Sequence, residues 1–218
     1  MRHKGKKTIN YILLPLIFII IGCGIFAAAG MPLKDMLIAK VQMAVVLGSP
    51  DYSYSASNND VKIEGYIKRS EMILPSVGSQ YGNLSCEKIG LKAPVYYGDT
   101  DKVLDKGVGQ YVQSGIPGEG TSILVGGHDV SYFAPLEKIK KGNILKFFTS
   151  YGEFQYKVSD INIAEATDET AYHLGSSKEQ LVLYTCYPFG DVFGTRDKRL
   201  YVYCEKISGP RIQEDSNE

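Results

Sequence analysis

The sequence lacks an excess of either charge, and it lacks the paired cysteines of a zinc site. Among its 218 residues, Lys and Arg together number 24, as do Asp and Glu, so the formal net charge is zero. No chain-wide electric field therefore attracts nucleic acid, and we predict no nucleic-acid partner. The four cysteines are dispersed and never show the CxxC spacing that zinc favours, so we predict no metal site.

Charged residues are also absent from the stretch between Ile9 and Gly30. At about 1.5 Å per residue this stretch can cross a hydrocarbon core of about 30 Å, so we predict a transmembrane anchor over 9–30. The basic residues in 1–8 predict a cytoplasmic tail, with the remainder outside the cell as part of a single-pass membrane protein. The small residues Ala27 to Gly30 leave a cleaved signal peptide as the alternative, although its apolar region usually spans only about 7 to 15 residues.

Beyond the anchor, composition divides the chain into three parts. Residues 31–75 combine helical spacing of apolar residues with a stretch rich in Ser, Asn and Asp, which predicts a juxtamembrane helix and a flexible stalk. Residues 76–207 consist of short apolar runs separated by turn residues. This texture predicts a mostly antiparallel sandwich or closed barrel, with short helical pieces near 99–104 and 132–139. Residues 208–218 form a polar tail.

Three cysteines follow the anchor, and an odd number cannot all pair within one chain. Cys86 and Cys204 each follow an apolar residue at a spacing of two, so both are predicted to lie in the core. Cys186 instead ends a strand-like run and precedes Tyr187 and Pro188, where the proline cannot continue a strand ladder. A thiol at the end of a strand beside a loop is accessible to substrate, so Cys186 is the candidate nucleophile.

A thiol is only slightly ionised at neutral pH unless a base or a cation assists it. His128 ends an apolar strand after two glycines, which leave room for another chain to approach, and it is the candidate general acid and base. Arg199 is the candidate cation for negative charge on a carbonyl oxygen, although Arg196 also follows Cys186. Asp129 directly follows His128, and neighbouring strand residues point to opposite faces, so no triad with this carboxylate is predicted.

Three segments of the chain together resemble the sortase family. Residues 115–128 run from Gly-Ile-Pro-Gly-Glu to Gly-Gly-His, 183–186 read Leu-Tyr-Thr-Cys, and 198–202 read Lys-Arg-Leu-Tyr-Val. They are similar, in that order, to the strand ending in the family's histidine, to its TLxTC signature and to its arginine-bearing strand. His128 precedes Cys186 by 58 residues (186 minus 128), and Arg199 follows it by 13 (199 minus 186), which fits the family. The run Thr-Cys-Tyr-Pro-Phe and the single predicted anchor are most similar to class D.

This resemblance implies an all-β closed barrel of about eight strands with short helices, and a cysteine transpeptidase at a Gram-positive cell surface. Cys186 would attack an LPxTG-type sorting signal near the C-terminus of an exported protein and form a thioester. His128 would assist transfer to an amine of a cell-wall precursor, and Arg199 would stabilise the oxyanion. Thr185 would either bind substrate or support its strand. The chemistry requires no cofactor.

Two other functions remain open at this point. A thiol hydrolase would use the same three residues and hand the acyl group to water. A non-catalytic, membrane-tethered barrel would only bind a peptide, with Cys186 in a structural role such as a disulfide with Cys204.

Overall fold

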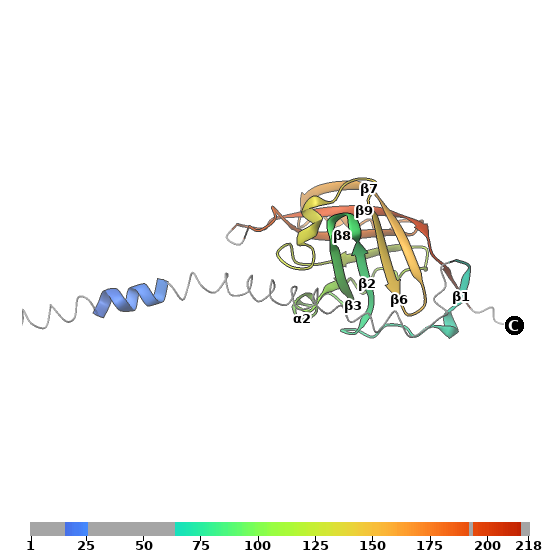
Figure 1. Cartoon of the computed structure of the whole chain (residues 1–218), viewed down its shortest axis with the longest axis horizontal. Helices are drawn as coiled ribbons and strands as arrows, with labels where there is room; N and C mark the ends of the chain where they lie inside the picture. Colours follow the sequence, from blue (N-terminus) through green and yellow to red (C-terminus); the bar gives the residue numbers. More distant parts are fainter. Residues whose placement is uncertain (1–15, 26–63, 192–193, 215–218) are drawn as a thin grey trace, which may run out of the picture. The chain divides into compact units, whose positions relative to one another are not determined.

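The computed structural model describes residues 16–25, 64–191 and 194–214. The chain divides into two units, Met1–Val41 and Gln42–Glu218, and each is described by itself. Their positions relative to one another are not defined in Figure 1.

In the first unit, residues 16–25 form a helix whose large apolar side chains are exposed. Within the described ranges, no helix is both long enough and apolar enough to span a membrane. The other residues of the predicted anchor, and the predicted juxtamembrane helix and stalk up to residue 63, lie outside the described residues.

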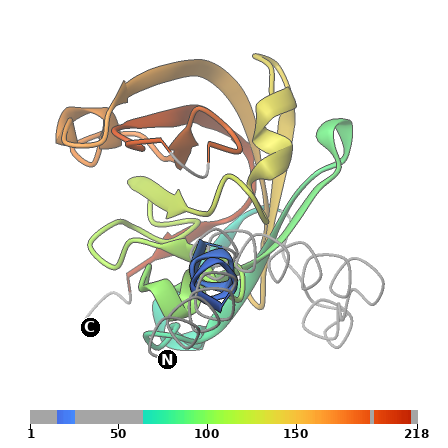
Figure 2. The ribbon, with the colours of Figure 1, turned by 90° about the vertical axis from the view of Figure 1, so that its left-hand side faces the viewer.

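The second unit is built around a closed β-barrel of eight strands (Figure 1). The strands follow the order β2-β3-β4-β5-β8-β9-β7-β6 around the barrel, which confirms the predicted closed β-barrel. Viewed after a 90° turn, they curve around a common interior (Figure 2). The strand bounds are β2 Gln80–Cys86, β3 Leu91–Tyr97, β4 Val108–Gln110, β5 Ser122–Gly126, β6 Ile144–Thr149, β7 Glu153–Glu165, β8 Gln180–Tyr187 and β9 Lys198–Ser208.

Alternation along the strands separates the barrel interior from its outer face. On β8, Leu181 and Leu183 are fully buried in the main core cluster, together with residues from all other barrel strands. Val182 has the opposite parity and belongs to a second cluster with Tyr201 and Tyr203 of β9. Because successive side chains of a strand point to opposite faces, Cys186 lies on the outer face with Val182.

Two pairs of barrel strands are parallel, although the sequence predicted a mostly antiparallel sheet. β3 pairs with β4, and β5 pairs with β8, in parallel, whereas the other neighbouring strands are antiparallel. Parallel neighbours need a long crossover connection. Between β5 and β8 this connection contains β6 and β7, so the hydrophobic pattern of the individual strands does not reveal the parallel pairing.

The helical segments are short. Two of them lie where the sequence predicts helical pieces, α2 and η4. Thr100 is the N-cap residue of α2, but its side chain makes no capping hydrogen bond. The bounds are η2 Arg69–Glu71, η3 Glu87–Ile89, α2 Asp101–Leu104, η4 Ala134–Lys138 and η5 Glu169–Tyr172.

Two further strands lie outside the 76–207 range predicted for the catalytic domain. β1 (Tyr66–Lys68) and β10 (Arg211–Gln213) pair in parallel as a separate two-stranded sheet. Ile67 of β1 is buried against Met72 and Ile116, with Ile212 of β10 packed beside them. The folded unit therefore begins before residue 76 and continues past residue 207.

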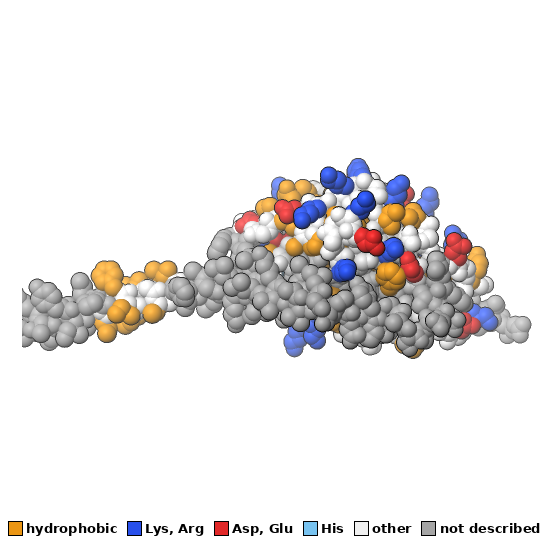
Figure 3. Space-filling model, in the orientation of Figure 1, with side chains coloured by type: hydrophobic (Ala, Val, Ile, Leu, Met, Phe, Trp, Pro, Cys, Tyr) orange, Lys and Arg blue, Asp and Glu red, His pale blue; other side chains and the backbone are white. Residues whose placement is uncertain are grey.

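Charges of both signs are interspersed on the visible face of this unit. Figure 3 shows basic and acidic side chains next to one another over the described surface. The chain as a whole has equal numbers of basic and acidic residues, and on the described part of this face the two kinds of charge are interspersed, without a broad patch of one sign.

Candidate active site

The parallel pairing of β5 with β8 brings the predicted histidine and cysteine to one end of the barrel. Gly126 at the end of β5 is the register partner of Tyr184, and the Gly127 N–H donates to the Tyr184 carbonyl at 3.2 Å. Because parallel strands advance in the same direction, two more residues carry the chain to His128 on one side and Cys186 on the other. Both residues are half-buried.

The two glycines before His128 provide space, but aromatic rings of the protein itself fill it. A Cβ on Gly126 would lie 2.5 Å from the Tyr184 ring, and one on Gly127 would lie 2.7 Å from the Phe133 ring. The interpretation that these glycines leave room for a second chain is therefore wrong. They allow the histidine segment to pack tightly against β8 and against Phe133.

Arg199 is the direct cross-strand partner of Cys186 in the antiparallel pair β8 and β9. Residues directly opposite one another in such a pair present their side chains on the same face. The Arg199 guanidinium nevertheless binds backbone, since its Nη1 donates to the carbonyls of Arg196 at 2.6 Å and Lys198 at 3.0 Å. Arg199 thus lies beside the candidate nucleophile and binds the backbone that leads into β9.

The guanidinium that reaches the sulfur belongs to Arg196. Its Nη1 lies 4.0 Å from the Cys186 Sγ, and its Nε donates to the Asp191 carbonyl at 3.1 Å. The sequence identified both arginines as candidates and favoured Arg199. Side-chain alternation cannot distinguish them, because Arg196 lies before β9, in the loop that follows β8.

Asp129 does not orient the histidine. Its side chain is completely buried, its Oδ2 accepts the Gly190 N–H at 2.9 Å, and its Oδ1 lies 3.6 Å from the Arg196 Nη1. Within the described part of the chain, no hydrogen bond or ion pair joins the His128 side chain to a carboxylate. The prediction that no triad forms with Asp129 agrees with this arrangement.

Thr185 supports its strand. Its side chain is almost fully buried, and its Oγ1 donates to the Gly127 carbonyl at 2.7 Å. The alternative that Thr185 binds substrate gains no support, because its hydroxyl is already engaged inside the protein. The hydrogen bond joins the residue before Cys186 to the residue before His128.

The remaining cysteines of the barrel are structural. Cys86 and Cys204 are buried, as predicted, and burial raises the pKa of both thiols. Cys204 pairs with Leu181, five residues before Cys186, so the two cysteines are about 17 Å apart along the sheet. A disulfide requires Cα atoms within about 7 Å. The described cysteines are all free, which removes the disulfide version of the binding-only hypothesis.

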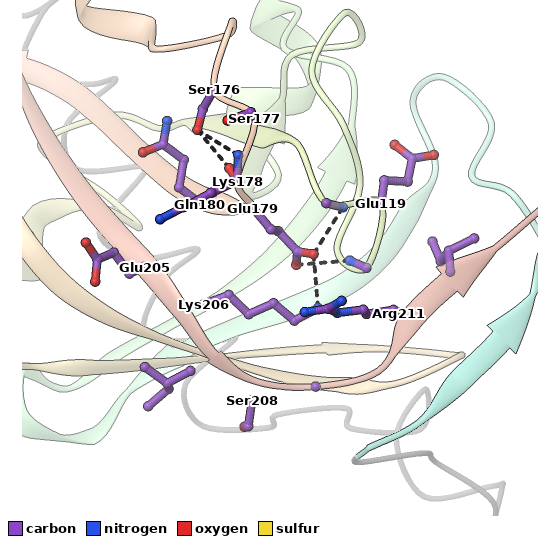
Figure 4. Close-up of a pocket in the computed structure, with 15 residues that line it drawn as sticks. Glu119, Ser176, Ser177, Lys178, Glu179, Gln180, Glu205, Lys206, Ser208 and Arg211 are labelled. Carbon is purple, nitrogen blue, oxygen red and sulfur yellow. Dashed lines mark hydrogen bonds and ion pairs between the residues drawn. The ribbon is translucent and has the colours of Figure 1, made fainter.

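A cavity of about 780 Å³ is lined in part by residues at the start of β8, the end opposite Cys186. Figure 4 shows the residues that line it. At its base, the Glu179 carboxylate accepts hydrogen bonds from the N–H groups of Gly118 and Gly120, the Tyr156 hydroxyl and the Lys206 ammonium group. These four donors saturate the carboxylate, so Glu179 joins several segments of the fold. Among the described residues, no cluster of three or more His, Cys, Asp or Glu could hold a metal ion.

Comparisons with known proteins agree with this geometry. A family model described as the sortase domain matches residues 84–207. Sortase D of Bacillus subtilis is 34% identical over 141 residues, covering 65% of this chain and 71% of that protein. Sortase C from Clostridium perfringens is 27% identical with a TM-score of 0.54, covering 61% of this chain and 72% of that one. The sortase D5 transpeptidase of Clostridium perfringens shares the fold with a TM-score of 0.53 at 19% identity, covering 78% and 98%.

Proposed function

The chain belongs to the sortase family of cysteine transpeptidases, and from this membership we propose that it cleaves an LPxTG-type sorting signal and transfers the exported protein to a cell-wall amine. The observation that carries the proposal is the convergence of the His128 segment, Cys186 and Arg199 at one end of the barrel. The signal lies near the C-terminus of the exported protein. The acceptor is an amine of a cell-wall precursor.

The first half of the reaction forms a thioester. The Cys186 thiolate attacks the carbonyl carbon of the threonine in the signal, and the oxygen takes up negative charge that Arg199 stabilises. His128, as the imidazolium, donates its proton to the departing amine when the peptide C–N bond breaks. The half-buried positions of both residues at the strand ends support this assignment, because each is partly exposed to an incoming peptide and partly shielded from water.

The second half transfers the acyl group. His128, now neutral, accepts a proton from the incoming amine as the nitrogen attacks the thioester carbonyl. The C–S bond then breaks and regenerates the Cys186 thiolate. Water is a competing acceptor, so the ratio of amide product to hydrolysed product measures how well the enzyme favours transfer.

Attachment of the chain to a membrane forms part of the proposal. The uncharged segment 9–30 would anchor the chain, and the basic tail 1–8 would remain in the cytoplasm. The barrel would then lie on the outer face, where exported proteins and cell-wall precursors are found.

The decisive experiment incubates the purified full chain, in detergent, with a panel of fluorogenic LPxTG-type peptides, with and without a glycine-based amine. We expect cleavage by the wild-type protein and an amide product, detected by mass spectrometry, only when the amine is present. Cys186→Ala should abolish cleavage and formation of the amide product. Cys204→Ala, which changes a buried cysteine outside the site, should retain both activities.

Three outcomes would contradict the proposal in different ways. Cleavage that yields only the acid at saturating amine would favour the hydrolase. Binding of peptide without cleavage would favour the binding-only barrel. Cleavage by Cys186→Ala would remove the assigned nucleophile.

A further inference from the structure

Two arginines lie beside Cys186, and the structure holds them in different ways. The Nη1 of Arg199 is engaged by two backbone carbonyls. The Nη1 of Arg196 faces two other groups, the Cys186 Sγ at 4.0 Å and the Asp129 Oδ1 at 3.6 Å. Arg196, which lies next to the Cys186 sulfur, is therefore also the arginine that pairs with a buried carboxylate, Asp129.

Asp129 depends on this arginine. Its side chain has no exposed surface, while that of Arg196 is one-third exposed. Oδ2 accepts the Gly190 N–H, but Oδ1 has no hydrogen-bond partner among the described groups and faces only the charge of Arg196. A buried carboxylate is unfavourable unless a cation or several donors compensate it. The ion pair with Asp129 thus holds the same Nη1 that lies 4.0 Å from the sulfur.

The backbone at Arg196 is also constrained. Its φ of 53° lies in the left-handed region, which residues other than glycine adopt rarely. The carbonyl of Arg196 is held by Arg199, and its Nε is held by the Asp191 carbonyl. Unfavourable backbone conformations persist where surrounding contacts over-determine them, and they concentrate at functional sites.

We propose that Asp129 is a positioning residue that holds the Arg196 guanidinium against the Cys186 sulfur, so that Arg196 stabilises the thiolate while Arg199 serves the substrate carbonyl. This inference rests on the proposed role of Cys186 as the nucleophile. It adds a role for Arg196 at the thiolate to the role at the carbonyl oxygen that the sequence predicts for Arg199. The thiolate, and not the thiol, is the nucleophile.

A purely structural role for the same ion pair makes a different prediction. If Asp129 and Arg196 only fasten the segment after β8, their loss lowers stability and leaves the ionisation of Cys186 unchanged. Alkylation of the thiol distinguishes the two roles, because the thiolate is the reactive species. Among the described residues, the other charged or titratable groups at this end of the barrel include His128, from the segment after β5, and Lys198 and Arg199, from β9.

The experiment measures the iodoacetamide alkylation rate of Cys186 in the full chain between pH 5.5 and 9.5, by mass spectrometry of the peptide that contains it. We expect Arg196→Gln to react about tenfold more slowly near pH 7, and to approach the wild-type rate at pH 9.5. Arg196→Lys regains part of the neutral-pH rate. Arg199→Gln, whose side-chain amide can still donate to the Arg196 carbonyl, keeps the alkylation profile and loses peptide cleavage. Arg211→Gln, an exposed arginine at the far end of the barrel, serves as the matched control.

Asp129→Asn provides the test of positioning. We expect the profile of Arg196→Gln, with no further change in the double variant, because both act through one guanidinium. Near-UV circular dichroism checks folding. If Asp129→Asn does not fold, Asp129→Glu, which keeps the charge but displaces the carboxylate, takes its place, and wild-type alkylation in Asp129→Glu would reject the positioning role. The same order of rates in a His128→Asn background excludes an effect through the imidazole.

Wild-type reactivity of Arg196→Gln at every pH, or a neutral-pH loss in Arg199→Gln instead, would overturn the inference. The alkylation needs no peptide, so failure of the LPxTG-type substrates is a separate result. Normal peptide cleavage with an unchanged alkylation profile in Arg196→Gln would reject the inference and keep the proposed function.

Discussion

Replacing Thr185 with valine removes one buried hydrogen bond while nearly preserving the shape of the side chain. Thr185 is 1% exposed, and its hydroxyl donates to the Gly127 carbonyl at 2.7 Å. Valine puts a methyl group in place of that donor and leaves the carbonyl without it. An unsatisfied buried acceptor costs about 1 to 3 kcal/mol, so we expect the free energy of unfolding of Thr185→Val to fall by this amount.

The same hydrogen bond aligns the two proposed catalytic segments, so activity should fall as well. It joins the residue before Cys186 to the residue before His128, and small displacements of reacting groups reduce rates strongly. We expect kcat of Thr185→Val to drop about tenfold, or about 1.4 kcal/mol in activation free energy, with KM nearly unchanged. A lower kcat with an unchanged KM would mean that the two segments are misaligned, while the contacts with the substrate are retained.

Urea unfolding and steady-state peptide cleavage measure the two effects, with Thr185→Ser as the matched control. Serine keeps the donor and loses one methyl group, so its stability should fall by less than about 1 kcal/mol and its kcat should remain close to wild type. Unchanged stability with a raised KM in Thr185→Val would refute this reasoning. In that case the hydroxyl contacts the substrate.

Two further predictions concern stability. Glu179→Gln should lower the free energy of unfolding by about 3 to 5 kcal/mol, because the Lys206 ammonium group loses its buried carboxylate partner. Urea unfolding measures this change. Lys206→Met should lower the free energy of unfolding less in the Glu179→Gln background than in the wild-type protein. An additive double variant would contradict the pairing. Tyr201→Phe should be neutral or slightly stabilising at pH 7, since the buried Tyr201 hydroxyl has no hydrogen-bond partner among the described groups. Burial raises the pKa of Tyr201 to about 12, whereas an unfolded tyrosine ionises near pH 10. The folded state therefore retains a proton that the unfolded state releases, so stability is lost as pH rises from 10 to 12, and Tyr201→Phe should lose less in urea unfolding at pH 10.5. Equal losses in both proteins would contradict the assignment.

The sequence patterns were sufficient to predict a sandwich or closed barrel, because the strands are short apolar runs bounded by turn residues. The choice of a closed barrel of about eight strands came from the resemblance to the sortase family. The sequence patterns also distinguished the partly exposed Cys186 from the buried Cys86 and Cys204, since only Cys186 ends a strand before a proline, whereas the other two alternate with core residues. Both inferences use local patterns that follow from the period of a strand. The structure preserves them because tertiary packing does not conflict with the local preferences.

The contacts between distant segments were not predictable in this way. β5 and β8 pair in parallel although β6 and β7 lie between them in the sequence, and the alternation of apolar residues in β5 and in β8 does not reveal this pairing. The contact of Arg196 with the sulfur depends on the path of the loop before β9. The packing of Gly126 and Gly127 depends on which aromatic rings face them, so the glycines indicated a close approach without identifying the neighbour.

A buried carboxylate paired with a cation occurs at both ends of β8. At one end it contributes to stability, and at the other we propose that it contributes to catalysis. At each end a buried carboxylate faces a cation and accepts backbone N–H groups. Glu179 is saturated by four donors, so nothing at that position remains available for reaction. Asp129 has an oxygen with no hydrogen bond, and its cation is shared with a sulfur. Because that arginine must compensate a carboxylate and also face Cys186, its position is fixed before any substrate arrives, which is the condition for electrostatic stabilisation without reorganisation.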